Sequence, residues 1–408
     1  MSRISECRIC GSSEIHPVLD LGHTPLADRL VKQSQLEQQD QRFPLEVGFC
    51  SNCSLLQIME TVPPSVLFCD DYPYYSSFSD YLLKHSKQNV EGIIEERKLG
   101  SDSLAIELAS NDGYLLKNYV NHGIPVLGID PAEGPAKEAE KIGVPTVIDF
   151  FSKAFSNRLV AEGKKADVIH ANNVLAHVAD LNDFVSGIAQ LLKDDGVAVI
   201  EAPYVKDLVD HCEFDTIYHE HLCYFSVTAL NQLFKQHDLS LNRVVRLSLH
   251  GGSLRLFVGK IKKVEESVTE LLELEKSSGV DKVSYYQDFS ERVNLIKESL
   301  KTLLQDLKSK GNSIAAYGAA AKGSTLINTS GIGTELIDFV VDKNVHKQGL
   351  FMPGQHIPIY SPDVILEKMP NFMLILPWNV TNEILSQQKE YIAKGGKFIV
   401  PIPEPKII

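Results

Sequence analysis

The sequence has little positive charge and no long apolar run. Its 53 acidic and 40 basic side chains leave a formal charge of −13, whereas a nucleic-acid-binding protein needs a basic surface to neutralise phosphates. No segment approaches the roughly 18–20 apolar residues of a membrane span, and the N-terminus lacks the apolar core of a signal peptide. We therefore expect a cytoplasmic protein that binds neither nucleic acid nor membrane, with its oligomeric state left open.

Cysteine is scarce, and its seven copies are an odd number that does not suit a disulfide scaffold. Four of them form two pairs, Cys7-x-x-Cys10 and Cys50-x-x-Cys53. In a reducing compartment such paired knuckles indicate one tetrahedral zinc ion with thiolates at about 2.3 Å. Because thiolates fill all four positions, we expect a structural zinc. A redox role is the alternative, and the doubling of the motif argues against it.

The length of 408 residues exceeds one ordinary core, so two or three domains are expected. Residues 1–70 are polar, turn-rich and irregular around the cysteines. From residue 103 onward, apolar strands alternate with amphipathic helices, which predicts an α/β fold with a parallel sheet covered on both faces. Residues 261–310 have helical periodicity and are expected to form a solvated helix pair that bridges to a second, smaller α/β domain.

The sequence contains no GxGxxG phosphate cradle, so a nucleoside cofactor without a pyrophosphate, S-adenosylmethionine (SAM), is the better candidate. Ligands of parallel sheets bind at the carboxyl ends of the strands. Asp130 ends the second strand, where a carboxylate can accept hydrogen bonds from two ribose hydroxyls, and the aromatic residues after the third strand could form a wall for adenine. The expected cofactor contacts are Glu107, Ala109, Asn111, Asp112, Gly113, Asp130, Asp149, Phe150 and Phe151.

Residues 214–225 read FDTIYHEHLCYF and place ionisable groups among apolar and aromatic residues. Burying Tyr218, Glu220 or His221 without a partner would cost about 1–3 kcal/mol each. We therefore expect this segment to line a pocket where protons move, since histidine titrates near neutral pH. The alternatives are a metal cluster or a fully hydrogen-bonded polar core. His177 follows the fourth strand and is expected at the same rim, although a lone histidine is often structural.

Together these motifs resemble those of the sugar C-methyltransferases that act on nucleotide-linked 4-keto-deoxysugars. The match runs nearly from end to end and includes both CxxC pairs, YPYYSS, ELASNDG, NNVLAHV, FDTIYHEHLCYFS, HGGSLR, AYGAAAKGSTLIN, VVDKNVHKQGLFMPGQHIPI and LILPWN. The resemblance implies a zinc-binding module (1–70), a SAM-dependent methyltransferase domain with a Rossmann-like fold (71–260), and a smaller Rossmann-like α/β domain (261–408) that helps to bind the nucleotide sugar.

The resemblance also implies an active site. It contains Tyr72, His177, Tyr218, Glu220 and His221, with His221 as the expected base and Tyr218 as the other candidate. One departure is Ala109, where the family more often has glycine. Abstraction of the C3 proton beside the 4-keto group would give an enolate that attacks the SAM methyl group. Glu220 or a neighbouring acceptor would orient His221, and Tyr218 or His177 would donate to the oxyanion at O4.

Two further segments are expected to hold the nucleotide. Lys322, Gly323 and Ser324 lie between a strand and a helix, where backbone N–H groups and an ammonium can meet a diphosphate. The alternative is close packing of small residues. Arg255 in HGGSLR is a second candidate contact.

Two other functions stay open at this point. A SAM-dependent O- or N-methyltransferase could use the same cofactor site. A zinc-ribbon adaptor with a degenerate methyltransferase domain is a non-catalytic reading, which the intact Asp130 and the YHEH block disfavour.

Overall fold

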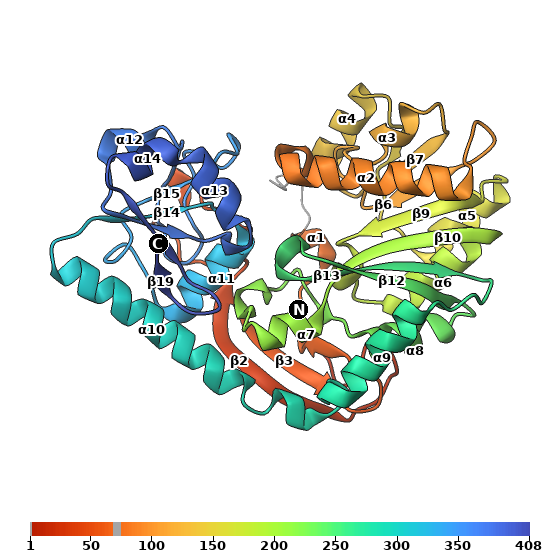
Figure 1. Cartoon of the computed structure of the whole chain (residues 1–408), viewed down its shortest axis with the longest axis horizontal. Coiled ribbons are helices and arrows are strands. Elements are labelled where there is room, and N and C mark those ends of the chain that lie inside the picture. Colours follow the sequence, from red (N-terminus) through yellow and green to blue (C-terminus); the bar gives the residue numbers. More distant parts are fainter. Residues whose placement is uncertain (1, 68–74) are drawn as a thin grey trace.

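The computed structural model describes residues 2–67 and 75–408. Two lobes rise from a common base, with the middle part of the chain in one and the C-terminal part in the other (Figure 1). Strands β2 (Ile15–Pro25) and β3 (Arg42–Cys50) run along this base. Among the described helices, none is long and apolar enough to cross a membrane. The expected α/β fold class with three parts is confirmed, while the boundaries at residues 70 and 260 stay predictions.

The N-terminal part contains a four-stranded antiparallel sheet, in the order β11-β4-β3-β2. Its other strands are β4 (Leu56–Ile58) and β11 (Cys223–Tyr224). The expectation of an irregular segment is wrong here, because buried Phe43, Leu45, Val47 and Phe49 alternate along β3 and cover one face of the sheet. Short elements flank it: β1 (Ser2–Arg3), η1 (Gln33–Gln35), β5 (Glu60–Thr61) and α1 (Pro64–Leu67).

The middle lobe is a seven-stranded mixed sheet in the order β12-β13-β10-β9-β6-β7-β8. The five strands from β6 to β10 are parallel, and β13 and β12 add antiparallel at one edge. Their bounds are β6 (Ala105–Leu108), β7 (Val126–Ile129), β8 (Thr146–Val147), β9 (Ala166–Asn172), β10 (Leu192–Pro203), β12 (Ser240–Leu247) and β13 (Ser253–Gly259). The parallel strands confirm the expected alternation from residue 103.

Helices cover both faces of this sheet (Figure 1). One face carries α2 (Asp80–Arg97), α3 (Lys117–Val120) and α4 (Glu133–Lys141). The other carries α5 (Lys153–Ala161), α6 (Leu181–Leu191) and α8 (Val227–Lys235). The links into and out of β9 and β10 include η3 (Leu175–His177), α7 (Val205–Asp210) and η4 (Phe214–Thr216). The turn η2 (Ser76–Phe78) precedes α2, and η5 (Leu249–Gly251) precedes β13.

Residues 266–309 form two long helices, as expected, but the first is not a solvated bridge. Helix α9 (Glu266–Ser278) packs on α8 and β12, and its Glu275 is fully buried. The Glu275 carboxylate accepts hydrogen bonds from the backbone N–H groups of Val227 and Thr228 at 2.6 and 2.8 Å and so caps α8. After η6 (Val283–Tyr286), helix α10 (Phe289–Ser309) spans the base of the C-terminal lobe.

The C-terminal lobe is a six-stranded sheet in the order β16-β15-β14-β17-β18-β19, parallel except for its last strand. The strands are β14 (Ile314–Tyr317), β15 (Val340–Val341), β16 (Ile359–Tyr360), β17 (Phe372–Ile375), β18 (Lys397–Val400) and β19 (Lys406–Ile407). The helices are α11 (Ala321–Ser330), α12 (Val364–Lys368), η7 (Trp378–Val380), α13 (Thr381–Gln387) and α14 (Lys389–Ala393). This second α/β domain is the one expected from the sequence.

One apolar core connects the base to the C-terminal lobe. Val47 and Phe49 of β3, Phe214 of η4 and Leu300 of α10 belong to the same buried cluster as Leu326 of α11. The segment that leads to residues 218–221 is therefore packed between both lobes.

Candidate active site

The four paired cysteines form one cluster. Their Sγ atoms all lie within 4.8 Å of one another, with Cys7 to Cys53 at 3.4 Å and Cys10 to Cys50 at 3.5 Å. A zinc tetrahedron with 2.3 Å bonds has edges of about 3.8 Å, so these thiols fit the ion. Both knuckles have the same backbone turn, because Gly11 N–H donates to the Cys7 carbonyl and Ser54 N–H to the Cys50 carbonyl, each at 2.9 Å.

The zinc cluster is joined to the YHEH segment by a strand. Cys53 lies three residues before β4, and β4 pairs with β11 so that Gln57 faces Cys223. The Ile58 N–H also donates to the Leu222 carbonyl at 2.9 Å. The N-terminal module thus holds the chain one residue after His221.

Tyr218 and His221 form a hydrogen-bonded pair. The Tyr218 hydroxyl lies 2.9 Å from Nε2 of His221, and Nδ1 of His221 lies 2.9 Å from the carbonyl oxygen of Thr216. Because a carbonyl only accepts, Nδ1 carries the proton and Nε2 of the neutral ring accepts from Tyr218. The acceptor that orients His221 is therefore Thr216 and not Glu220, since the tight turn of residues 216–221 points this carbonyl back at the ring.

The other two histidines lie close by but differ in role. The ring of His177 packs edge-on against His221, with centroids 4.8 Å apart, and burial lowers the pKa of His177 to about 4. It is therefore neutral near pH 7. His219 is tied to β3, because its Nε2 lies 3.0 Å from the Pro44 carbonyl. Burial lowers the pKa of His219 as well, and these contacts give it a structural role.

Glu220 faces the N-terminal module. Burial and, to a smaller extent, the nearby carboxyl of Asp28 raise the pKa of this carboxyl group to about 8. Both residues line a cavity of about 580 Å³. Its remaining wall comes from the end of β2 and the segment after it, from β3, α1 and Tyr75, and from His346, Leu350 and Pro353 of the C-terminal lobe. Tyr72, the fifth expected active-site residue, lies outside the described residues.

The expected cofactor residues gather at the carboxyl ends of β6 and β7. Asp130 accepts backbone N–H groups from Asn111 and Ala132, both at 2.8 Å. Asn111 and Asp112 in turn accept the N–H groups of Ser76 and Ser77 at 2.8 and 3.1 Å. Burial raises the pKa of Asp130 and, more strongly, that of Glu107.

Several polar atoms at this edge have no hydrogen-bond partner among the described residues. Glu107 Oε2, Ser110 Oγ and Asp112 Oδ1 are all buried in this way. Acceptors left open at the ends of parallel strands suit a ligand that donates hydrogen bonds. The ammonium and ribose hydroxyls of SAM are such donors, so these residues fit the cofactor. Gly113 has a φ of 75°, and an added Cβ would come within 3.1–3.2 Å of Val144, Ala139 and Ile142.

Ala109 has a φ of 56°, in the left-handed region that disfavours a Cβ. Its departure from the family's glycine therefore costs backbone strain here. The three expected cofactor residues that lie beyond β8, Asp149, Phe150 and Phe151, have different surroundings. Phe150 is exposed and remains a candidate adenine wall, whereas Phe151 packs on Phe155 and Phe184. Asp149 pairs with Arg158 at 2.7 Å on the surface.

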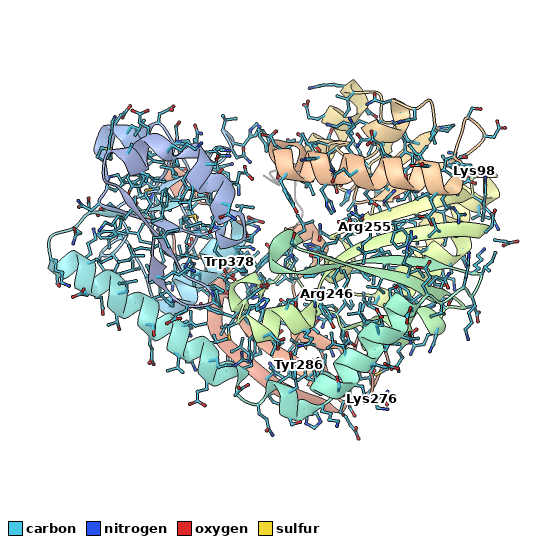
Figure 2. The ribbon with its side chains drawn as sticks, in the orientation of Figure 1. Lys98, Arg246, Arg255, Lys276, Tyr286 and Trp378 are labelled. Atoms are coloured by element: carbon cyan, nitrogen blue, oxygen red, sulfur yellow. The ribbon has the colours of Figure 1, made fainter. Side chains whose placement is uncertain are left out.

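The expected nucleotide contacts have internal partners. An added Cβ on Gly323 would lie 2.7 Å from Leu376, and Ser324 is buried beside it. Close packing of small residues, the alternative named above, therefore accounts for Gly323 and Ser324. Arg255 donates to the buried Glu201 carboxylate at 2.7 Å and lies 2.9 Å from His85. Figure 2 places Arg255 in the middle lobe and Trp378 across from it.

The Lys322 ammonium donates to Asn379 Oδ1 at 2.8 Å and lies over the ring of Trp378. Its charged neighbours are Asp215 and Glu213, and burial lowers the pKa of this amine. The Lys322 ammonium is therefore bound by other residues of the protein itself.

Sequence reasoning missed residues whose role depends on backbone geometry. The Thr216 carbonyl orients His221, and a carbonyl has no residue signature. Asn172 ends β9 and Asn173 follows it, and their Oδ1 atoms are buried without a partner among the described residues. The pair of asparagines at a strand end was a signal that could have found them.

Comparisons with known proteins agree with this arrangement. Residues 7–68 match a zinc binding domain family, residues 86–244 a methyltransferase domain family, and residues 248–403 a family described as C-methyltransferase C-terminal domain. The chain is 34% identical to C-methyltransferase NovU of Streptomyces niveus over 408 residues, which are 99% of this chain and 97% of that protein.

Solved structures of SAM-dependent methyltransferases resemble part of the chain. One from Clostridium acetobutylicum is 12% identical, with 46% of this chain and 94% of that chain covered and a TM-score of 0.35. The magnesium protoporphyrin IX methyltransferase of Synechocystis is 13% identical, with 43% and 77% covered and a TM-score of 0.33. Likeness at this level carries no information on activity.

The middle domain and the four-cysteine cluster define a SAM-dependent methyltransferase with a zinc site. The chain belongs to the C-methyltransferase family, and it is a SAM-dependent C-methyltransferase with SAM and structural zinc as its cofactors. The expected C-methyltransferase activity is thereby confirmed. It is favoured over the two alternatives, which were an O- or N-methyltransferase and a non-catalytic adaptor.

Proposed function

We propose that this enzyme methylates C3 of a nucleotide-linked 4-keto-deoxysugar. A sugar carbon becomes a nucleophile only beside a carbonyl, after a base has removed its proton. The observation that carries the proposal is the Tyr218–His221 pair, with His177 against it. Bound SAM supplies an electrophilic methyl group, and the residues at the ends of β6 and β7 would hold it.

The pair is suited to move one proton. Because Thr216 holds the Nδ1 proton of His221, the Nε2 lone pair points to Tyr218 and accepts its hydroxyl hydrogen. In the proposed reaction Nε2 takes the C3 proton directly, or the Tyr218 oxygen takes it. In the second route the hydroxyl proton of Tyr218 passes to Nε2 at the same time. The resulting imidazolium donates to the Thr216 carbonyl, which stabilises it.

The oxyanion that develops at O4 needs a donor. With its pKa raised to about 8, Glu220 is mostly protonated at neutral pH and can donate a hydrogen bond. His177, neutral and buried beside His221, is the other candidate. A donor of this kind contributes about 3–4 kcal/mol to the transition state.

We propose that the cavity of about 580 Å³ next to Glu220 receives the nucleotide sugar. Its size falls within the range of small-molecule sites, roughly 300–1,000 Å³. Arg29 and His346 in its wall are exposed and can meet a diphosphate. This location supports the expected part of the C-terminal domain in substrate binding.

The first experiment identifies the substrate. The zinc-loaded enzyme is incubated with methyl-¹³C-labelled SAM and a panel of nucleotide-linked 4-keto sugars, and products are analysed by mass spectrometry and NMR. We expect a ¹³C-methyl group bonded to C3. A methyl group on oxygen or nitrogen, or no product with any 4-keto sugar, would contradict the proposal.

The second experiment tests the base. With S-adenosylhomocysteine bound, the wild-type enzyme should exchange the C3 hydrogen for deuterium in D₂O. His221→Asn should slow this exchange and lower kcat by about 10²–10⁴-fold, with little change in S-adenosylhomocysteine affinity. His16→Asn, on the exposed face of β2, is the matched control and should behave as wild type. Equal exchange in His221→Asn would exclude His221 and leave Tyr218 as the base.

A further inference from the structure

Three segments far apart in the sequence meet beside the proposed base. Asp215 of η4, which is buried, forms a cluster with the half-buried Lys322 of α11 and Trp378 of η7. The indole N–H of Trp378 donates to Asp215 Oδ2 at 2.7 Å, and the Lys322 ammonium lies 4.9 Å from the centroid of the Trp378 ring. Lys322 also donates to Asn379 at 2.8 Å. The middle and C-terminal parts of the chain are thus connected by polar groups at this point.

The charges of the cluster depend on one another. Asp215 is fully buried, and burial raises its pKa to about 6, while Lys322 and the Trp378 hydrogen bond oppose the rise. Burial likewise raises the pKa of Glu213 to about 8. The positive charge of Lys322 and the Trp378 N–H thus both favour the ionised form of the buried Asp215 carboxyl group. Removing the Lys322 charge or the Trp378 N–H would take away a group that stabilises the buried Asp215 carboxylate.

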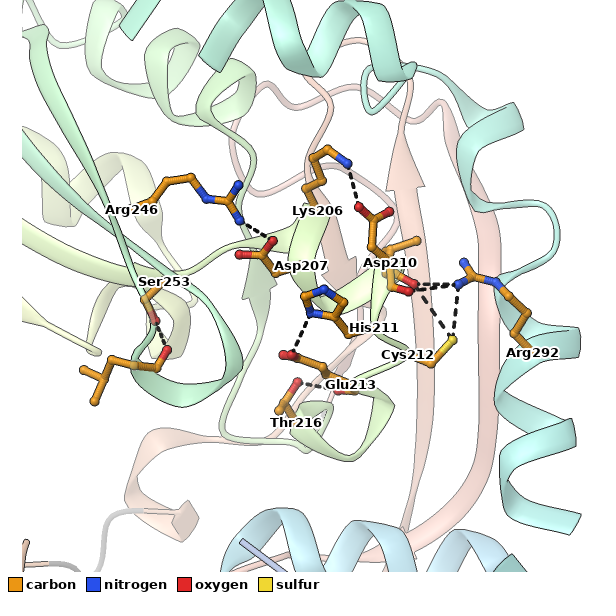
Figure 3. A network of polar contacts seen from close by, with 12 residues as sticks. Lys206, Asp207, Asp210, His211, Cys212, Glu213, Thr216, Arg246, Ser253 and Arg292 are labelled. Atoms are coloured by element: carbon orange, nitrogen blue, oxygen red, sulfur yellow. Dashed lines mark hydrogen bonds and ion pairs between the residues drawn. The ribbon is translucent and has the colours of Figure 1, made fainter. Parts of the chain in front are cut away.

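The cluster is adjacent in sequence to the carbonyl group that orients His221. Asp215 is followed by Thr216, whose carbonyl oxygen lies 2.9 Å from His221 Nδ1. The Thr216 side chain is held as well, since its hydroxyl donates to the Glu213 carbonyl at 2.7 Å. Figure 3 shows Glu213 and Thr216 in the turn after α7.

Helix α7, which leads into this turn, is tied to neighbouring elements. Arg246 of β12 contacts Asp207 at 2.5 Å, and Arg292 of α10 donates to the Val209 carbonyl at 2.9 Å (Figure 3). The position of Thr216 is therefore set from the middle lobe on one side and from the C-terminal lobe on the other.

We propose that Asp215, Lys322 and Trp378 are positioning residues, through which the C-terminal domain fixes the Thr216 carbonyl and hence the Nδ1-protonated tautomer of His221. The inference rests on the proposed function, in which His221 takes the C3 proton. It assigns Lys322 a different role from the diphosphate contact expected from the sequence. None of the three residues needs to touch the substrate.

Two variants test this role. Trp378→Phe keeps an aromatic ring over Lys322 and deletes only the N–H that Asp215 accepts. Lys322→Met removes the charge at similar length. Both should lower kcat by about 10- to 10²-fold, as expected when a reacting group is displaced, with KM for the nucleotide sugar and the Kd of S-adenosylhomocysteine unchanged. Lys310→Met, at an exposed ion pair with Asp306, is the matched control and should leave kcat unchanged.

A second readout reports on His221 without substrate. In ¹⁵N-histidine-labelled enzyme, the His221 signals are assigned by their loss in His221→Asn. We expect a protonated Nδ1 and an unprotonated Nε2 in wild type and in Lys310→Met, and a mixture of tautomers in Trp378→Phe and Lys322→Met. Because no sugar is present, this result does not depend on which substrate the enzyme uses.

Two outcomes would overturn the inference. If Lys322→Met raises KM for the nucleotide sugar and leaves kcat unchanged, Lys322 is a substrate contact and not a positioning residue. If the ¹⁵N shifts of His221 are the same in wild type and Trp378→Phe, the cluster does not set the tautomer. Trp378→Phe decides the question by itself if Lys322→Met does not fold.

Discussion

At the residue scale, the Asp130 carboxylate can hold the backbone of the cofactor site in place and also contact the cofactor. Its two oxygens accept the N–H groups of Asn111 and Ala132, one on each side of the strand end. Each oxygen keeps a second lone pair, so the carboxylate can still accept ribose hydroxyls. We infer that Asp130 holds the loop after β6 in place for the cofactor as well as contacting it.

Asp130→Asn should therefore weaken cofactor binding in two ways. The amide loses the charge, and its NH₂ group must face either a backbone N–H or a ribose hydroxyl. We expect S-adenosylhomocysteine affinity to fall by about 1.5–3 kcal/mol, measured by isothermal titration calorimetry. Asp102→Asn, in the exposed turn before β6, is the control and should bind normally. An unchanged dissociation constant in Asp130→Asn would refute the assignment.

At the element scale, the pairing of β4 with β11 links the zinc cluster to the proposed active site. Cys50 ends β3, Cys53 lies three residues before β4, and β11 begins two residues after His221. Two strands of two and three residues cannot be stable by themselves. Their alignment therefore depends on the zinc-bound turn at one end and on the packing of Leu222 and Phe225 in the core at the other.

Removal of zinc should therefore loosen the segment after His221. In Cys50→Ser we expect less bound zinc by elemental analysis. Hydrogen exchange in peptides covering residues 56–58 and 222–225 should be faster by about ten-fold or more, because local opening becomes easier. Cys212→Ala, a buried cysteine outside the cluster, should keep its zinc and its exchange rates. Full zinc occupancy in a Cys7→Ser/Cys50→Ser double variant would rule out this metal site.

At the scale of the whole molecule, buried carboxyl groups where the lobes meet connect stability to pH. The pKa of Glu213 is raised from 4.5 to about 8. Between these values the folded chain keeps a proton that the unfolded chain has lost. The free energy of unfolding therefore decreases as pH rises from about 4.5 to 8. The contribution of one such group is at most about 1.4 kcal/mol per pH unit.

Glu213→Gln should remove this dependence, because an amide does not titrate. We expect urea unfolding between pH 6 and 8 to show a smaller decrease in stability for the variant than for wild type. Asp215, with its pKa near 6, adds little to the slope in this window, and Glu220 contributes equally to both proteins. Glu270→Gln, on the exposed side of α9, should keep the wild-type slope. Parallel curves for Glu213→Gln and wild type would contradict the raised pKa.

The sequence alone determined the features that depend on local order. The CxxC spacing predicted the four zinc ligands, because two knuckles of that length present two thiols each to one point. Apolar runs from Ile106 to Ile399 predicted the parallel strands of both lobes, since buried strands need side chains that suit both faces. The strand ends at Glu107 and Asp130 indicated an edge of the sheet for the cofactor, and the contacts of SAM with these residues stay a prediction.

The tertiary structure decided which of the remaining polar groups meet. It placed Thr216, not Glu220, against His221, gave Lys322 the partners Asp215 and Trp378, and added β11 to the sheet of the zinc module. It also buried Glu275 in a segment whose charges had indicated a solvated helix. These pairs join residues separated by up to 168 positions, and no short-range period or spacing encodes them. They follow from the packing of the lobes, which brings buried polar groups from distant segments together, because burying such groups without partners is costly.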